Sequence, residues 1–214
     1  MTRVLYLANT DLGWEMYHHL RWIGGEVVFE GCNDYHIKDW SKIPPYDLGV
    51  NFLATHKIPS SEFTIPYRWL NFHPAPLPEY KGRNLAYHAI INGEKEFGAT
   101  LHYMAPEYDT GPIIEVKKFP IENHHTSGDL VKISHQLLKE LFIKWVPRIL
   151  NGEEIPSTPQ NKGEGRYYKK SPLCEEISIP DSSKIVIRAL TCHPKHHAQI
   201  TISGKKYKII PCEE

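Results

Sequence analysis

Hydrophobic positions near the start of the chain predict a strand, a helix and a second strand. The apolar run 4–8 ends at the polar residues 9–11, and Gly24 and Gly25 precede a β-branched run over 26–29. Between these runs, apolar side chains recur with the spacing of one buried helix face at Leu12, Met16, Leu20 and Ile23. We therefore expect a βαβ unit with a right-handed crossover, followed by a parallel sheet.

The middle of the chain predicts more buried strands and one long helix. Apolar runs cover 48–53, 67–72, 99–104 and 112–119. Thr126 and Asp129 have the spacing of a helix capping box. An apolar helix face follows at Leu130, Ile133, Leu137, Leu138, Leu141, Phe142, Trp145 and Ile149. The pattern predicts an α/β domain with a mostly parallel, twisted sheet flanked by helices over residues 1–150.

The last part of the chain has a different pattern. Residues 151–179 open with a polar stretch rich in Gly, Lys and Pro, which predicts a linker or an excursion across the surface. Residues 180–214 predict a small β subdomain with strands over 184–190, 198–203 and 207–211, the last two joined as a hairpin at Gly204, Lys205 and Lys206.

Composition and charge narrow the classes of function. The chain has 214 residues, of which 41% are hydrophobic, and 25 Lys and Arg balance 25 Asp and Glu, so no overall field attracts nucleic acid or an anionic membrane. Apolar runs are too short to span a bilayer, and Asp11 and Glu15 interrupt any signal peptide, so we expect a cytoplasmic protein. The four scattered cysteines are expected to be reduced. Paired histidines without convergent partners do not predict a metal site.

Candidate chemistry begins at the end of the strand predicted over 67–72. Asn71 and His73 alternate onto one face there, with Phe72 on the other. The carboxyl ends of such strands are where ligands bind in open α/β sheets. The three prolines in 74–78 then force a stiff exit from the sheet. Asp109 lies in a turn between two later strands, where its carboxylate could simply bond its own backbone.

Three ordered motifs carry a resemblance to a known family. They are the Asn71–Gly82 segment NFHPAPLPEYKG, the Gly98–His102 segment GATLH and the Asp109–Ile113 segment DTGPI. Together they resemble the formyltetrahydrofolate-dependent formyltransferases over about the first two thirds of the chain. Two departures are the Ala75-Pro76 pair and Lys81, where Ser-Leu and Arg are common in the family. The resemblance implies a Rossmann-like domain and one-carbon (formyl) transfer from 10-formyltetrahydrofolate as cosubstrate, without a metal.

The resemblance also implies roles for residues. Asn71, His73 and Asp109 match the catalytic Asn, His and Asp, so Asn71 would donate to the developing oxyanion. His73 would donate to the same oxygen or accept the amine proton, and Asp109 would orient His73 and stabilise its charged form. The family's pterin site corresponds to Phe52, Leu53, Ala54 and Thr55 together with Met104, Tyr108 and Asp109. The substrate side corresponds to Asn9, Thr10, Asp11, Lys81, Tyr167, Tyr168 and Lys169.

The C-terminal part of the chain bears on which molecule accepts the formyl group. Methionyl-tRNA formyltransferases carry a sizeable extra C-terminal domain and a basic surface, which the end of this chain does not predict. The segments 166–171 and 187–209 are similar to the substrate-side stretch and C-terminal β element of nucleotide-sugar formyltransferases. We therefore expect N-formylation of a dTDP-4-amino- or 3-amino-dideoxysugar for surface polysaccharide such as lipopolysaccharide O-antigen. The expected partners are these small molecules and a second copy of the chain in a homodimer, with no nucleic acid and no membrane.

Three alternatives remain open at this point. Glycinamide ribonucleotide formyltransferase fits the chain length, although its chain is expected to end near the long helix. Formyltetrahydrofolate hydrolase uses the same three groups with water as acceptor. A non-catalytic folate-binding module is a third alternative, which the intact set of Asn71, His73 and Asp109 disfavours.

Overall fold

A computed structural model gives the fold of the chain. It describes residues 2–32, 37, 39–55, 57–65, 68–161, 163–169, 185, 188, 199–202 and 204–208. The strands are β1 (Arg3–Ala8), β2 (Glu26–Cys32), β3 (Leu48–Phe52), β4 (Trp69–His73), β5 (Tyr80–Gly82), β6 (Glu96–Tyr103), β7 (Ile113–Pro120), β8 (Arg166–Tyr168), β9 (Gln199–Ile202) and β10 (Lys205–Lys208). The helices are α1 (Asp11–Trp22), α2 (Leu85–Ile91) and α3 (Ser127–Leu150), with the 3-10 turns η1 (Trp40–Lys42) and η2 (Ser60–Phe63).

A six-stranded sheet organises the molecule, in the order β2-β1-β3-β4-β6-β7. The first four of these strands are parallel, and β6 and β7 are antiparallel to their neighbours. The predicted α/β class with a mostly parallel sheet is confirmed. Because β6 is antiparallel to β4, with Tyr103 opposite Leu70, the β6–β7 loop leaves the sheet at the amino end of β4 and folds back towards the middle of that strand.

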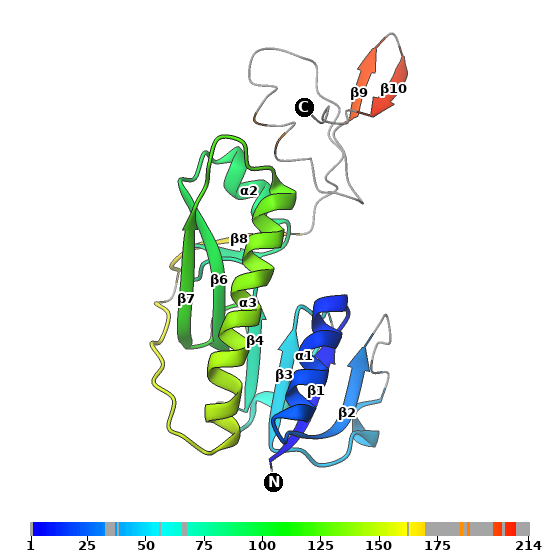
Figure 1. The fold of residues 1–214 in the computed structure, drawn as a ribbon, viewed down its shortest axis with the longest axis vertical. Coiled ribbons are helices and arrows are strands. Elements are labelled where there is room, and N and C mark those ends of the chain that lie inside the picture. Colours follow the sequence, from blue (N-terminus) through cyan, green and yellow to red (C-terminus); the bar gives the residue numbers. More distant parts are fainter. Residues whose placement is uncertain are drawn as a thin grey trace.

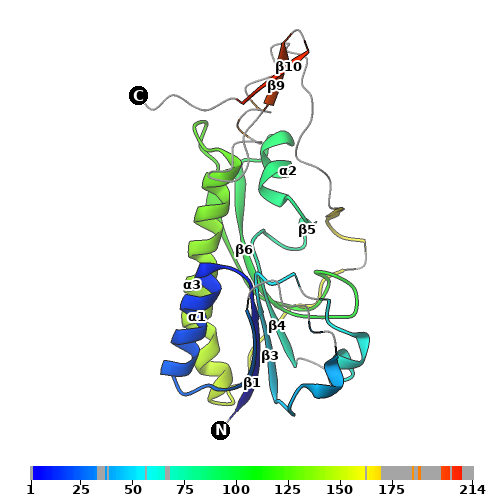
Figure 2. The ribbon, with the colours of Figure 1, turned by 90° about the vertical axis from the view of Figure 1, so that its right-hand side faces the viewer.

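The two faces of the sheet are covered differently. Figures 1 and 2 show α1 and α3 side by side against one face. Along β1, Val4 and Tyr6 point into the core under these helices, whereas Leu5 and Leu7 point into a second core on the opposite face. The side chains packed in that second core come from β4, the 3-10 turns and loops, so among the described elements the α-helices over the main sheet lie on one face.

α3 begins and packs as its sequence pattern predicts. The Thr126 side chain accepts from the Asp129 backbone N–H at 3.2 Å, and the Thr126 backbone N–H donates to the Asp129 carboxylate at 2.8 Å, which completes the capping box. Leu138, Phe142 and Trp145 are buried against the sheet. None of the helices in the part of the chain that the structure describes is long and apolar enough to cross a membrane.

The segment after α3 returns to the main domain. Thr158 bridges to Ile113 in β7, and β8 pairs with β5 in a small parallel sheet. This pairing needs Gly82, which has a φ of 98° and whose Cβ position would lie 2.1 Å from the Tyr168 carbonyl oxygen. Part of the stretch 151–179, which the sequence predicts as a linker, therefore packs on the α/β domain.

The C-terminal part that is described contains an antiparallel hairpin. β9 and β10 pair around Gly204, and Lys205 and Lys206 belong to β10 rather than to the turn. Figure 1 shows this hairpin at the α2 end of the molecule. Ile185 and Arg188 have helical backbone conformation, which corrects the strand predicted over 184–190 at these two positions. The remaining residues of that prediction lie outside the described part of the chain.

Replacing Gly49 with alanine is expected to destabilise the fold by about 1–3 kcal/mol, because the new methyl group would overpack the core. The added Cβ would lie 2.2 Å from the Trp69 ring, which is 1% exposed and donates through its indole N–H to the Tyr46 hydroxyl at 3.2 Å. Urea unfolding measures the loss. The double variant with Trp69→Leu should recover part of it, and a Gly49→Ala protein as stable as wild type would contradict this packing.

Candidate active site

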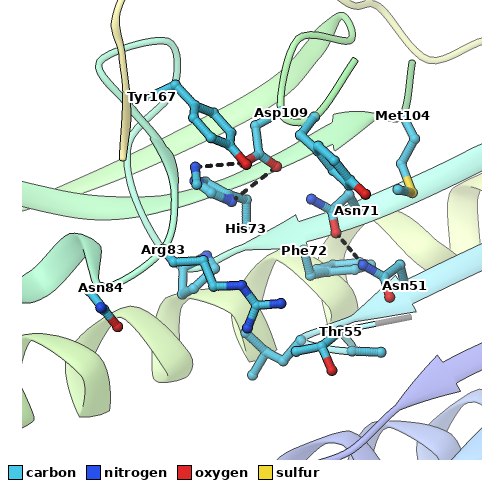
Figure 3. Close-up of a pocket in the computed structure, with 15 residues that line it drawn as sticks. Asn51, Thr55, Asn71, Phe72, His73, Arg83, Asn84, Met104, Asp109 and Tyr167 are labelled. Carbon is cyan, nitrogen blue, oxygen red and sulfur yellow. Dashed lines mark hydrogen bonds and ion pairs between the residues drawn. The ribbon is translucent and has the colours of Figure 1, made fainter. Parts of the chain in front are cut away.

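Three side chains that are far apart in the sequence meet at the carboxyl end of β4. Asn71 and His73 point to one face of the sheet, while Phe72 points to the other face and packs under α3. Asp109 comes from the loop between β6 and β7, where its φ is 58°. His73 Nδ1 and Asp109 Oδ1 are 3.5 Å apart, and Figure 3 shows Asn71 beside this pair. The structure therefore brings together the three groups that the sequence singled out.

Asn71 is the middle member of a polar row across three neighbouring strands. Asn51 on β3 and His102 on β6 are its partners in the strand registers on either side. Asn51 Nδ2 donates to Asn71 Oδ1 at 2.7 Å, and Asn71 Nδ2 lies 2.9 Å from His102 Nε2. All three side chains are buried. Hydrogen bonds on both sides therefore hold the Asn71 amide in one orientation.

A backbone carbonyl fixes the direction of the hydrogen bonds in this row. His102 Nδ1 lies 2.7 Å from the Tyr103 carbonyl oxygen, which can only accept, so Nδ1 carries the proton. Neutral His102 then accepts at Nε2 from one N–H of Asn71, and Asn71 Oδ1 accepts from Asn51. The second N–H of the Asn71 amide has no role in the row and is left for a ligand.

Burial keeps His102 neutral. The loss of solvation lowers the pKa of His102 to about 4, although the Asp109 carboxylate at 4.0 Å acts to raise that pKa. A protonated Nε2 could not accept from Asn71, and the amide would lose its orientation. His102 must therefore be neutral for the Asn71 amide to keep its orientation.

Replacing His102 with glutamine is expected to flatten the fall in stability at acid pH. The folded-state pKa of His102, about 4, lies below the ordinary value of 6.5. Between these two pH values the unfolded chain therefore binds a proton at His102 that the folded chain does not bind. The stability from neutral His102 is thus fully present above about pH 6.5 and is lost, by about 3 kcal/mol in total, as the pH falls towards 4. Urea unfolding across this range gives the slope. An unchanged slope in the variant would contradict the assignment.

His73 is oriented by a main-chain carbonyl on its far side. His73 Nε2 lies 2.8 Å from the Tyr80 carbonyl oxygen, so this nitrogen donates, and Nδ1 is the atom that gains or loses a proton. Nδ1 faces Asp109 Oδ1. The Asp109 carboxylate therefore faces the ring nitrogen of His73 that does not bond to the main chain.

Asp109 is held by groups from two other segments. The Gly82 backbone N–H donates to Asp109 Oδ2 at 2.9 Å. Gln160 Nε2 donates to the carbonyl oxygens of Asp109 and Gly111, at 3.1 and 2.8 Å. A Cβ on Gly111 would lie 1.9 Å from the Tyr103 carbonyl oxygen, so only glycine fits the close approach of the loop. These contacts fix a carboxylate that stands in a left-handed backbone conformation.

Two cavities adjoin at this point. One has a volume of about 460 Å³ and the other about 310 Å³, and both are lined by Asn71, Met104, Tyr108 and Asp109. Figure 3 shows Arg83 extending into the larger cavity towards Thr55, with Tyr167 on the far side of His73 from Asn51. Asn71 and Asp109 stand where the contents of the two cavities would meet.

The predicted pterin residues divide between these cavities and the core. Leu53, Ala54 and Thr55 line the larger cavity, and Met104, Tyr108 and Asp109 line both. Phe52 is fully buried under α3 and lines neither.

The predicted substrate residues are more dispersed. Tyr167 lines the larger cavity. Lys81 is buried, and its Nζ donates to the Glu164 carbonyl at 2.8 Å. The Tyr168 ring is buried and stacks on Tyr80 and His88, with ring centroids 5.4 and 4.1 Å away, so it is a packing residue rather than a surface for a base.

The N-terminal loop and Lys169 lie outside the linings of both cavities. Asn9 donates to Thr55 Oγ1 at 3.4 Å, at the margin of the larger cavity. Thr10 caps α1 by accepting from the Gly13 backbone N–H at 3.1 Å. Asp11, the first residue of α1, and Lys169 are exposed.

Four functional positions were missed by reasoning from the sequence. Asn51, His102 and Gln160 were not singled out, although His102 stands inside one of the quoted motifs, and Arg83 follows another directly. Asn51 is a polar residue within an apolar strand, as Asn71 is. Two such residues in successive predicted strands were a sequence signal that could have identified Asn51. Gln160 carried none, because its contact with the Asp109 loop depends on the course of the segment after α3. Among the described residues, no cluster of three or more potential metal ligands occurs.

Comparison with known proteins finds similarity to formyltransferases. Residues 53–146 match the family described as formyl transferase. The methionyl-tRNA formyltransferase of Lactobacillus gasseri is 31% identical over 144 residues, covering 65% of this chain and 45% of the relative. That of Dictyoglomus thermophilum is 33% identical over 147 residues, covering 67% and 46%. The chain thus spans less than half the length of these curated relatives.

Solved structures show the same fold. A 4-N formyltransferase from Francisella tularensis superimposes with a TM-score of 0.83 at 20% identity, covering 100% of this chain and 98% of that one. The N-formyltransferase of Helicobacter canadensis, solved with folinic acid and dTDP-3-aminofucose, gives a TM-score of 0.78 at 19% identity, covering 96% and 86%.

Proposed function

We propose that this chain, whose residues 53–146 match the formyl transferase family, is an enzyme that moves the formyl group of 10-formyltetrahydrofolate to the amine of a nucleotide-linked amino sugar. The observation that carries the proposal is the meeting of two cavities at Asn71 and Asp109, beside His73. A transfer between two bound molecules needs two sites with the reacting atoms at their junction.

The smaller cavity suits the pterin end of the folate. Its lining includes the apolar side chains of Ile58, Phe63 and Met104, together with the loop 104–109. Such a lining fits a flat, hydrogen-bonding ring system, with the apolar side chains against its faces and polar loop groups at its edge. Bound there, the folate would supply an activated formyl group, and these residues would orient it and exclude water.

The larger cavity suits the acceptor. Arg83 supplies a cation and Tyr167, which is half exposed, supplies an aromatic ring. A guanidinium pairs well with phosphate, and a tyrosine ring can stack on a base. We therefore give the phosphate contact to Arg83, which lines the larger cavity and was not among the substrate residues expected from the sequence.

The reaction joins the amine nitrogen to the formyl carbon, breaks the bond from that carbon to N10 of the folate, and moves the amine's proton to N10. Asn71 would donate its free N–H to the formyl oxygen as that oxygen gains negative charge. The polar row holds the donor in place before the reaction, so little reorganisation is needed.

His73 and Asp109 would handle the proton. The attacking amine becomes positively charged, and the Asp109 carboxylate stands between the cavities and His73 Nδ1. The pair can accept the proton and return it to the leaving nitrogen, because Nδ1 is the free position of the ring.

The extent of the structural likeness supports the proposal of an amino-sugar acceptor. Neighbours that superimpose over nearly the whole of both chains include the 4-N formyltransferase and the aminofucose complex described above. We propose a dTDP-4-amino- or 3-amino-dideoxysugar as acceptor, made for surface polysaccharide, and a cytoplasmic homodimer as the working form. Methionyl-tRNA is the second candidate acceptor, because the curated relatives that match in sequence are methionyl-tRNA formyltransferases.

A panel of acceptors tests the proposal. Incubation with 10-formyltetrahydrofolate and dTDP-4-amino- or dTDP-3-amino-dideoxysugars, glycinamide ribonucleotide or initiator methionyl-tRNA is followed by mass spectrometry for a gain of one formyl group. Gain on an amino-sugar nucleotide supports the proposal. Gain on another acceptor alone, formate release without any amine, or folate binding without turnover would each replace it with the corresponding alternative.

A further inference from the structure

One buried oxygen beside the reacting centre has no partner. Asn51 is 8% exposed, and its Oδ1 accepts no hydrogen bond from any residue that the structure describes. Gln160 Oε1 is in the same position within the described part of the chain, but Gln160 lines neither cavity, whereas Asn51 lines the larger one. A buried carbonyl oxygen that has lost its water is unfavourable until a donor pairs with it.

The identity of this atom as an oxygen follows from the polar row. The Tyr103 carbonyl fixes the proton on His102 Nδ1, His102 Nε2 accepts from Asn71, and Asn71 Oδ1 must then receive the N–H of Asn51. The Asn51 amide cannot turn over without placing two oxygens against each other at 2.7 Å. The end of Asn51 that is not bonded in the row is therefore its carbonyl.

The row offers two opposite groups to a ligand. Asn71 has one N–H to donate, and Asn51, directly across the β3–β4 register, has one oxygen to accept with. We propose that Asn51 Oδ1 accepts a hydrogen bond from the acceptor amine, and that Asn51 is a specificity-determining residue for that amine. This inference rests on the proposed function.

The chemistry of the two reactants favours the amine as the donor. The formyl oxygen can only accept, so it pairs with Asn71 and cannot satisfy Asn51. The amine must stand next to the formyl carbon, and it carries N–H groups to spare. An N–H held by Asn51 also limits rotation of the amine, so that its lone pair can be directed at the carbon. Asn51 lines the larger cavity and not the smaller, which agrees with a contact to the acceptor rather than to the pterin.

Binding measurements with a matched pair of ligands test this contact. The ligands are dTDP-3-aminofucose, or the amino-sugar nucleotide that the acceptor panel identifies, and the same nucleotide with hydrogen in place of the amine. Calorimetry in the presence of 5-formyltetrahydrofolate keeps the folate site filled. Wild type is expected to prefer the amine by about 3- to 10-fold, the range for a hydrogen bond between neutral groups.

Two substitutions at Asn51 separate the roles of its two ends. Asn51→Leu removes both, and its amine preference should fall to about twofold or less. Asn51→Asp keeps an acceptor oxygen at the end that faces the cavity, so it should retain the preference. Its other oxygen faces Asn71 Oδ1 in place of the N–H that supported Asn71, so its turnover number should drop. Asn51→Ser, whose hydroxyl is too short to reach, replaces the leucine variant if that protein does not fold.

The outcomes distinguish the inference from the function on which it rests. A leucine or serine variant that keeps the wild-type preference overturns the contact, even where the enzyme formylates the sugar. Loss of the preference in Asn51→Asp also overturns it, since the acceptor is still present. A wild-type protein that binds neither nucleotide and formylates no amine in the panel overturns the proposed function, and the contact with it.

Discussion

Replacing Asn71 with alanine is expected to lower the turnover number for formyl transfer by about 100- to 1000-fold, the cost of removing one oxyanion donor. The reason is geometric as well as chemical. The Asn71 amide is held by Asn51 and by neutral His102, so its free N–H is fixed in direction. Water could not take its place with the same orientation. Initial rates of amine formylation at saturating folate measure the effect.

The controls for this substitution examine folding and folate binding. Alanine at position 71 leaves Asn51 and His102 without their shared partner, so circular dichroism and thermal unfolding must accompany the rates. The folate Kd should change little, because most of the smaller cavity is contributed by other residues. Asn123→Ala, at an exposed turn, serves as the matched control. A folded Asn71→Ala protein with more than a tenth of wild-type turnover would show that this amide is not the main oxyanion donor.

Replacing Asp109 with asparagine is expected to lower the turnover number by about 100- to 10,000-fold, the usual range for a positioned acid or base. Asparagine keeps the shape of the side chain and tolerates the left-handed backbone, where φ is 58°. Its carbonyl oxygen can still accept from the Gly82 N–H. The substitution therefore removes the negative charge opposite His73 Nδ1 and little else.

The readout for Asp109→Asn is the turnover number for the amine. The KM values for both substrates should change by much less than the turnover number, because proton transfer rather than binding is impaired. Asp39→Asn, which changes an exposed carboxylate at the start of a 3-10 turn, is the control. Near-normal turnover in a folded Asp109→Asn enzyme would show that the Asp109 carboxylate takes no part in proton transfer.

Much of the fold was predictable because long periodic patterns dominate local structure. β1, α1 and α3 were all predicted within a few residues, and the capping box at Thr126 marked the start of α3. α2 was missed. It is a short helix, Leu85–Ile91, and the preceding Asn84 gives no side-chain cap and stands in a left-handed conformation. Its formation depends on packing of Leu85 and Ala89 in the core beneath β5 and α3 rather than on local signals.

The candidate site was predictable only in part, because some of its contacts depend on how neighbouring strands pair. Asn71, His73 and Asp109 stand in motifs that resemble the formyltransferases, and the structure places them together. Asn51 and His102 become neighbours of Asn71 only once the pairing of three strands is known. The sequence of one strand does not specify which residue of the next strand lies opposite, so the polar row required the structure.

The hold of Gln160 on the Asp109 loop has a consequence for engineering. The same short segment supports the Asp109 loop through Gln160 and forms a wall of the larger cavity through Tyr167. Replacing this segment with that of a relative that uses another acceptor would therefore change the position of the Asp109 carboxylate together with the choice of acceptor. A chimera that carries Gln160 over unchanged should stay fast while its preference shifts, and one that loses Gln160 should be slow towards every acceptor.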